Sequence, residues 1–386
     1  MKLPWTKGEE VKSTSSMMVA LSQLGSARWG SRSSEALMRD GYLRNAVAYR
    51  CVRMVAEAAA SVPLMSTHEE AGNLLARPMP DEAGPSLFET LYSHLQMSGN
   101  AYVEAIQIDA GEAPKGLQVL RPERMKPLVD ARGWISGWTY TVDRRERRIM
   151  RDEAGWCPVL HLKCFHPASD VSGLPPLAAA RQALDLHNAS ADWAKALIDN
   201  SAKPSGALVY GRDGARMTDE QFDRLKTELE TAHAGAENAG RPLLLEGGLD
   251  WKQMSLSPAE MDFREARNGA AREIALALGV PPQLLGIPGD NTYANYKEAN
   301  HAFWRMTVLP LVNKTASSIG LWMSGCFDEE VMVRVALDAV PALSVEREAL
   351  WARLEAASFL TMAEKREMVG LPELNAEQVE DAGKAA

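Results

Sequence analysis

The first half of the chain contains two helix-like segments followed by four strand-like ones. Residues 45–63 and 85–99 carry apolar side chains at helical spacing, and Gly99 is a natural end for the second helix. The strand-like segments alternate apolar and polar positions and are rich in β-branched and aromatic residues: 100–109, 116–130, 133–143 and 157–166. We therefore expect an α+β domain of antiparallel strands in this half.

A long helix is predicted between Pro175 and Pro204. At about 1.5 Å per residue, its roughly 24 residues would span about 36 Å. Two series recur at intervals of seven residues, an apolar one (Leu177, Leu184, Ala191, Ile198) and an acidic one (Asp185, Asp192, Asp199). The acidic series fits either an ordinary solvated face or a face that repels DNA, and the pattern does not separate the two.

A small α/β insert follows the long helix. Residues 205–211 read as a strand, a helix with a capping box at Thr218 comes next, and two further strands enclose residues 247–248. A second helix is then predicted from Ser257, a good N-cap residue, to Gly279. The insert therefore separates two helices.

The segment 280–292 is an unusual loop. It holds three prolines and two glycines, yet it is more apolar than an ordinary solvated turn. A long helix is predicted at 293–323, with a kink at Pro310. The rest of the chain predicts a strand at 331–338 and two short helices, the second with a capping box at Thr361.

The charge of the chain argues against a protein that grips nucleic acid through phosphates. The formal net charge is −9, whereas such proteins rely on many lysines and arginines. The basic cluster at 143–151 is interrupted by acidic residues and lies between two strand-like segments, so we expect a solvated hairpin there. Trp134 and Trp138, just before it, are expected to pack in the core.

The composition indicates a soluble, intracellular protein. The chain has 386 residues, of which 46% are apolar, enough for two or three domains. No run approaches the roughly 18 apolar residues that a membrane helix needs. The first residues include Glu9 and Glu10, which do not fit a signal peptide. We therefore expect no membrane association.

Neither a metal site nor a catalytic site is expected. Cys157, His161, Cys164 and His166 lie close together in the sequence. In a strand, however, alternate side chains point to opposite faces, so these four cannot converge on one ion. The sequence also lacks the P-loop, the nucleophile elbow, the HExxH zinc motif and the dinucleotide-binding glycine motif. We expect no enzyme activity and no cofactor.

Seven segments, in order, resemble the portal proteins of tailed bacteriophages, the head-to-tail connectors of long-tailed phages and prophages. They are NAVAYRCVRMVAEAAASVPL, SGNAYVEAI, SGLPPLAAARQAL, AKPSGALV, NAGRPLLLEGGLDWKQMSLSPAEMDF, REIALALGVPPQLLG and YANYKEANHAFWRMTVLPLV. The resemblance spans residues 40–372. It also suggests a gene transfer agent, a particle that reuses phage parts to carry host DNA.

The resemblance implies a portal-type organisation in which each predicted element has a place. The expected regions are a flexible N-terminal arm (1–35), an α+β wing (36–174), a first stem helix (175–200), an α/β clip (201–256), a second stem helix (257–279), a tunnel loop (280–293), a return to the wing with a long kinked helix and a strand (294–340), and a short helical crown with the C-terminal tail (341–386).

The resemblance also implies a function. Portal proteins form rings, typically of twelve subunits, at one capsid vertex, and double-stranded DNA passes through the ring during packaging and ejection. The expected DNA-facing residues of the tunnel loop are Gly286, Ile287, Pro288, Gly289, Asp290, Asn291 and Thr292. The acidic residues Asp185, Asp192 and Asp199 are candidates for the channel wall.

The partners implied by the resemblance are the major capsid protein at the wing, and the terminase large subunit and then the head-completion adaptor at the clip. The expected location is the head–tail junction of a virion, with assembly in the bacterial cytoplasm. The alternative is a non-portal head–tail adaptor ring. An adaptor would not need a clip-like insert between two stem helices followed by a loop.

Overall fold

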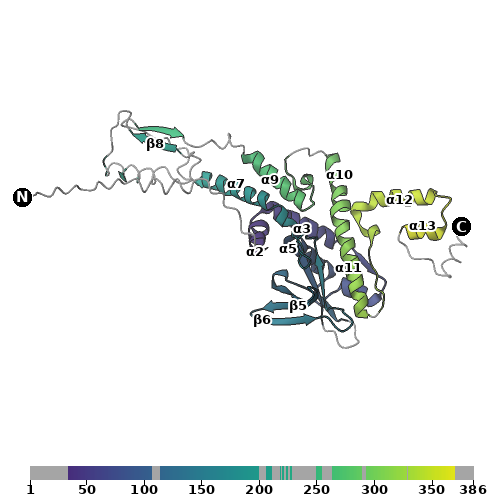
Figure 1. Cartoon of the computed structure of the whole chain (residues 1–386). Helices are drawn as coiled ribbons and strands as arrows, with labels where there is room; N and C mark the ends of the chain where they lie inside the picture. Colours follow the sequence, from purple (N-terminus) through teal and green to yellow (C-terminus); the bar gives the residue numbers. More distant parts are fainter. Residues whose placement is uncertain are drawn as a thin grey trace, which may run out of the picture.

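The computed structural model (Figure 1) describes most of the chain. The described residues are 34–106, 114–199, 206–210, 249–253, 263–288, 293–327 and 329–369, with a few single positions between 218 and 227. Several predicted features lie outside them: the N-terminal arm up to residue 33, most of the helix in the insert, the first turns of the second stem helix, loop residues 289–292 and the tail beyond 369. None of the helices in the described part is long and apolar enough to span a membrane.

Helices α3 (Ala46–Ala60) and α5 (Gly84–Ser98) form the centre of the main core. Asn45 caps α3, because its side-chain oxygen accepts hydrogen bonds from two backbone N–H groups in the first turn, each at 3.1 Å. Helix α5 ends at Gly99 in the left-handed conformation, with φ of 71°, as the sequence predicted. Both helices predicted for this part of the chain are confirmed. Their most deeply buried side chains include Val52, Val55, Leu91 and Tyr92.

Two three-stranded antiparallel sheets complete the first half. One has the order β3 (Gly116–Leu120), β2 (Asn100–Ile106), β7 (Val159–Lys163), and the other the order β4 (Met125–Val129), β5 (Ile135–Val142), β6 (Arg145–Met150). The α+β prediction is confirmed. The segment 116–130 is not one strand, since a 3₁₀ turn at Pro122–Arg124 divides it between the two sheets. A proline lacks the N–H that a continuous ladder requires.

A buried carboxylate joins the two sheets. The Glu104 side chain of β2 is only 4% exposed, and it accepts two hydrogen bonds from the Arg147 guanidinium of β6, at 2.6 and 2.7 Å. Gln118 on β3 donates a third, at 2.8 Å. The bond to Glu104 raises the pKa of Arg147 further. The Arg147 side chain is itself 52% exposed, so the pair adds to the solvated hairpin that the sequence predicts and does not contradict it.

The rest of the basic cluster forms the exposed hairpin that the sequence predicted. Asp143 and Arg144 make its turn with φ values of 48° and 66°, and they connect β5 to β6. Trp138 is buried between the sheets, at 3% exposure, as expected. Trp134 is 74% exposed, so the prediction that it packs in the core is wrong. It lies in the β4–β5 turn, beyond the reach of either sheet's core face.

His161 of β7 is part of an aromatic cluster. Its ring stacks on Tyr102, with centroids 4.5 Å apart, and meets Trp138 edge-on at 4.9 Å. Its Nε2 lies 3.0 Å from Oδ1 of Asn100. Burial, with a smaller effect from the Lys163 cation, lowers the pKa of His161 to about 4. Within the described residues, no cluster of three or more His, Cys, Asp or Glu side chains could hold a metal ion.

The lowered pKa of His161 leads us to expect that the folded chain loses stability in mild acid. Below about pH 6.5 the unfolded chain protonates this histidine, whereas the folded chain does not until about pH 4. The free energy of unfolding should therefore fall by about 2 kcal/mol between pH 7.5 and pH 5 on account of this group. Urea unfolding of wild type and His161→Phe, which keeps a ring on Tyr102, measures the difference. Equal pH slopes for the two proteins would show that His161 does not contribute.

The predicted first stem helix is two helices. Helix α6 (Pro176–Ala179) and helix α7 (Arg181–Asp199) meet at Ala180, whose φ and ψ of −83° and 3° interrupt the regular helix. The prediction of a single continuous helix is therefore wrong, although the predicted start after Pro175 is confirmed. Helix α9 (Phe263–Ala277) packs beside α7. Beyond the end of α7, strands β8 (Gly206–Tyr210) and β9 (Leu249–Gln253) pair antiparallel (Figure 1).

The long helix after the loop has three parts: α10 (Tyr293–Phe303), a π-helical segment (Trp304–Val308) and α11 (Leu309–Phe327). The irregularity lies in the turn before Pro310, as expected from the hydrogen bond that a proline cannot donate. The helix is longer than the predicted 293–323. Two indole groups bind α11 to the sheet region, since Trp156 donates to the Trp322 carbonyl at 2.9 Å and Trp322 to the Cys157 carbonyl at 2.8 Å.

The remaining elements are short. Strand β10 (Val333–Val335) pairs with β1 (Leu64–Ser66), and helix α4 (Glu69–Ala76), which was not predicted, follows β1. Helices α12 (Ser344–Ala356) and α13 (Met362–Met368) project to one side of the long helix (Figure 1). The predicted capping box of α13 is confirmed, because the Glu364 carboxylate accepts from the Thr361 N–H at 2.7 Å and the Thr361 hydroxyl oxygen accepts from the Glu364 N–H at 3.3 Å.

Candidate functional site

The loop between α9 and α10 begins at a well-defined helix end. Gly279 has φ of 69°, its N–H donates to the Leu276 carbonyl at 3.0 Å, and the Val280 N–H donates to the Ala275 carbonyl at 2.9 Å. These two bonds are the Schellman pattern, in which a left-handed glycine satisfies the last carbonyls of a helix. Val280 is then buried, at 1% exposure. The prediction that Gly279 ends this helix is confirmed.

A contact with the long helix fixes the start of the loop. The Thr307 hydroxyl, in the π-helical segment, donates to the Gly279 carbonyl at 2.6 Å. A Cβ atom on Gly279 would lie only 2.8 Å from the Thr307 hydroxyl oxygen. Both the positive φ and this close approach therefore require glycine at this position. The entry of the loop is bound on one side to α9 and on the other to the long helix.

The described part of the loop, 280–288, stays close to the core. Pro282–Leu285 form a 3₁₀ turn whose last two leucines pack against the main core, and Gly286 follows with φ of 69°. The Arg272 guanidinium of α9 donates to the Pro288 carbonyl. Of the predicted tunnel-loop residues, Gly286, Ile287 and Pro288 thus lie at the base of the loop. Gly289, Asp290, Asn291 and Thr292 lie outside the described residues.

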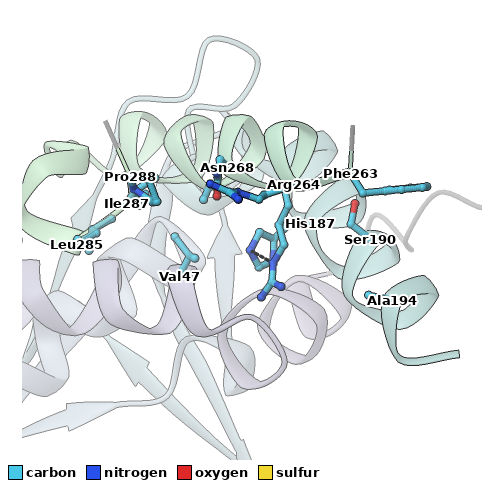
Figure 2. Close-up of a pocket in the computed structure, with 13 residues that line it drawn as sticks. Val47, His187, Ser190, Ala194, Phe263, Arg264, Asn268, Leu285, Ile287 and Pro288 are labelled. Carbon is cyan, nitrogen blue, oxygen red and sulfur yellow. Dashed lines mark hydrogen bonds between the residues drawn. The ribbon is translucent and has the colours of Figure 1, made fainter. Parts of the chain in front are cut away.

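A hollow of about 480 Å³ lies between the base of the loop and helices α3, α7 and α9 (Figure 2). Ile287 and Pro288 border it on the loop side, and His187 borders it on the α7 side. Arg264 and Arg267 of α9 give its wall a positive charge. None of the predictions from the sequence found this hollow, because three of its walls come from helices far apart in the chain, α3, α7 and α9.

Buried polar side chains bind α7 to the N-terminus of α3. The Asn45 amide donates to Oδ1 of Asn188 at 2.9 Å and lies 3.1 Å from Nδ1 of His187. Asn188 in turn donates to the Asp40 carbonyl at 2.7 Å, in the π-helical turn Met38–Leu43 that follows α2 (Ser34–Leu37). Burial, together with the nearby Arg267 cation, lowers the pKa of His187. Hydrogen bonds between these buried polar side chains therefore connect α7 to the start of α3.

The three aspartates of the acidic series differ in their surroundings. Asp185 is half-buried, and Asp192 is exposed but forms an ion pair with Arg44. Asp199 is the last residue of α7, and its side chain lies outside the description. In the apolar series Leu177 and Leu184 are buried and Ala191 is half-buried. The side chain of the fourth member, Ile198, lies outside the description, and the role of the acidic series stays a prediction.

The arrangement suits positioning rather than bond chemistry. Helix α9 and the long helix hold the described part of the loop, through the bond of Arg272 to the Pro288 carbonyl and that of Thr307 to the Gly279 carbonyl. The base of the loop therefore has little conformational freedom.

Comparisons with known proteins agree on one family. A family model described as phage portal protein matches residues 46–370. A chain in the neck of a native GTA (gene transfer agent) particle, computed with C12 symmetry, is 48% identical. The match to that chain has a TM-score of 0.68 and covers 92% of this chain and 99% of the other.

Relatives identified by sequence point the same way. An uncharacterised protein of Rickettsia bellii (strain RML369-C) is 41% identical over 345 residues, which is 87% of this chain and 89% of that protein. The portal protein of Enterobacteria phage HK97 is 23% identical, over 73% of this chain and 67% of its own length.

Proposed function

Because this chain belongs to the phage portal protein family, we propose that it forms a ring of twelve copies at one vertex of a particle and lines the channel for double-stranded DNA. The observation that carries the proposal is the 48% identity with a chain of a GTA particle neck, computed with C12 symmetry. At that identity, over nearly the full length of both chains, the same mode of assembly is expected. We therefore place the protein in a gene transfer agent or a related particle.

The structure supports this proposal through the helix pair and the loop. Helices α7 and α9 pack together, with β8 and β9 beyond their far end, and the loop leaves α9 at its other end (Figure 1). This order agrees with two stem helices, a clip between them and a tunnel loop after them. The remaining boundaries of wing, arm and crown follow the ranges proposed from the sequence. In this assignment the tip residues 289–292 face the channel.

The charge also supports a conduit. A net charge of −9 per chain, repeated around a ring, disfavours adhesion to phosphates. Asp185 and Asp199 stay our candidates for the channel wall. Asp192 would contribute less, because Arg44 already neutralises it. Arg264 and Arg267 line the hollow behind the loop.

The partners follow from the same assignment. We propose that the clip meets the terminase large subunit during packaging and a head-completion adaptor afterwards, and that the wing meets the major capsid protein. In this role the protein is structural and needs neither a catalytic residue nor a cofactor.

Light scattering and negative-stain microscopy of the purified chain test the ring. We expect a particle with a central hole and a mass of about 506 kDa, twelve times 42.2 kDa. The companion variant replaces Asp290, Asn291 and Thr292 by glycine, which should leave the ring intact and sharply reduce the yield of DNA-filled particles. A wild-type chain that stays at 42.2 kDa, even when the other particle proteins are present, would contradict the proposal. Normal DNA packaging by this variant would show that the loop tip does not line the channel.

A further inference from the structure

An apolar groove of about 420 Å³ lies beside the start of the loop, on the side of the long helix. Two of its side chains, Leu276 at the end of α9 and Met306 in the π-helical segment, are each 78% exposed. The other apolar side chains along it are Val280, Pro281, Pro282, Ala302 and Phe303. Isolated exposed apolar residues are ordinary, but a groove lined with them marks a surface that another protein covers.

The groove is rigid before anything occupies it. The Thr307 hydroxyl fixes Gly279 at one wall, and Pro281 and Pro282 fix the backbone of the floor. The π-helical segment carries Met306, which faces the same groove as Leu276. A preformed surface loses little conformational entropy on binding.

The charges at the rim argue against DNA as the occupant. Arg272 and Glu273 are the charged residues that line the groove, and their formal charges cancel. A surface for phosphates would carry an excess of positive charge. The remaining lining is almost wholly apolar, which suits a protein surface of the same kind.

We propose that an apolar surface of the neighbouring copy in the ring fills this groove. The inference rests on the proposed function, since a ring closed by rotation joins two different surfaces of each chain. One surface is then the groove, and the other must be a second exposed apolar set on the same chain. Exposed apolar side chains outside the groove lining are candidates for that set: Leu43 at 71% exposure, Leu186 at 47% and Tyr49 at 41%.

The test combines two charge substitutions in one chain, Leu276→Asp and Met306→Asp. Both side chains are largely exposed in the single chain, so the folded monomer should persist and circular dichroism should show an unchanged helix content. In the ring, two carboxylates would be buried in a groove whose lining includes one cation, Arg272, which could neutralise at most one of them. Light scattering should then show loss of the ring and a species of 42.2 kDa. The matched control, Leu276→Met with Met306→Leu, keeps the groove apolar and should keep the ring.

A photoreactive benzophenone side chain in place of Met306 gives a readout that does not depend on disrupting the ring. In assembled rings, irradiation should join two copies covalently, and the peptide attached to position 306 would identify the second surface. Rings that persist in the double aspartate variant, or that give no crosslink between copies, would overturn this inference and leave the proposed function intact. A wild-type chain that never forms a ring would overturn the proposed function itself.

Discussion

Replacing Arg147 with alanine should lower the free energy of unfolding by about 2 kcal/mol, because it leaves a buried carboxylate without its cation. The loss is smaller than for a fully buried pair, since the Arg147 side chain is 52% exposed and water screens the interaction. Glu104 is 4% exposed and would retain only the 2.8 Å hydrogen bond from Gln118. Removing one partner of such a pair costs more than removing both, since the remaining charge stays desolvated. Urea unfolding, followed by circular dichroism, measures the change.

The neighbouring residue provides the control. Arg148 is on the same strand, is exposed, and has no side-chain partner among the described residues. Arg148→Ala should therefore change the unfolding free energy by less than about 0.5 kcal/mol. Combining Glu104→Gln with Arg147→Ala should recover part of the loss, because the buried group is then neutral. Equal stability of the Arg147→Ala and Arg148→Ala variants would show that the two sheets are not joined through this pair.

Replacing Gly173 with alanine should destabilise the chain by about 3 kcal/mol or more, because the added methyl group would overlap fixed backbone. Its Cβ would lie 2.0 Å from the Gly99 carbonyl oxygen and 2.8 Å from the Cys164 nitrogen. These two atoms are themselves hydrogen-bonded, at 2.8 Å, and Asn100 accepts from the Gly173 N–H at 2.7 Å. No flexible side chain is available to yield. Chemical or thermal unfolding of the variant measures the loss.

A second glycine offers a control with the opposite sign. Gly269 lies inside α9, and nothing approaches within 4 Å of the position that its Cβ would take. Gly269→Ala should raise stability by about 0.5–1 kcal/mol through helix propensity alone. If Gly173→Ala were also neutral or stabilising, the junction where α5, β7 and α6 meet would have to be much looser than the contacts indicate.

Local chemistry explains which features the sequence predicted well. The ends of helices at Gly99 and Gly279 and the capping box of Thr361 and Glu364 depend on residues a few positions apart, and all three are confirmed. The α+β architecture follows from alternating patterns that are equally local. The order of the elements came from these local patterns, and the family resemblance then supplied the role expected of each region, which no periodicity could give.

Features that depend on distant contacts were missed or misjudged. Glu104 and Arg147 are 43 positions apart, and nothing in a basic hairpin indicates which of its arginines contacts a buried carboxylate. His187 and Asn45 are 142 positions apart, so the polar junction behind the loop has no signal in the sequence. The break at Ala180 occurs in a strongly helical segment, and its cause lies in packing rather than in propensity.

The candidate site shows the same division between local features, which the sequence predicted, and distant contacts, which it did not. The sequence located the loop and its glycines, because turn residues have known backbone preferences. The sequence did not indicate the hydrogen bonds from Thr307 to the Gly279 carbonyl and from Arg272 to the Pro288 carbonyl, because they depend on how α9 packs against the long helix. Those contacts are what makes the base of the loop rigid, and they exist only in the folded chain.

The π-helical segment has a consequence for how related chains can differ in length. It accommodates one residue more than a regular helix would, so α10 and α11 are two helices in different angular phase. Loss of a single residue from Trp304–Val308 would restore the regular phase and turn α10 by roughly 100° about its axis relative to α11. A change that is trivial in an alignment would thus aim the loop in another direction while leaving its own residues untouched.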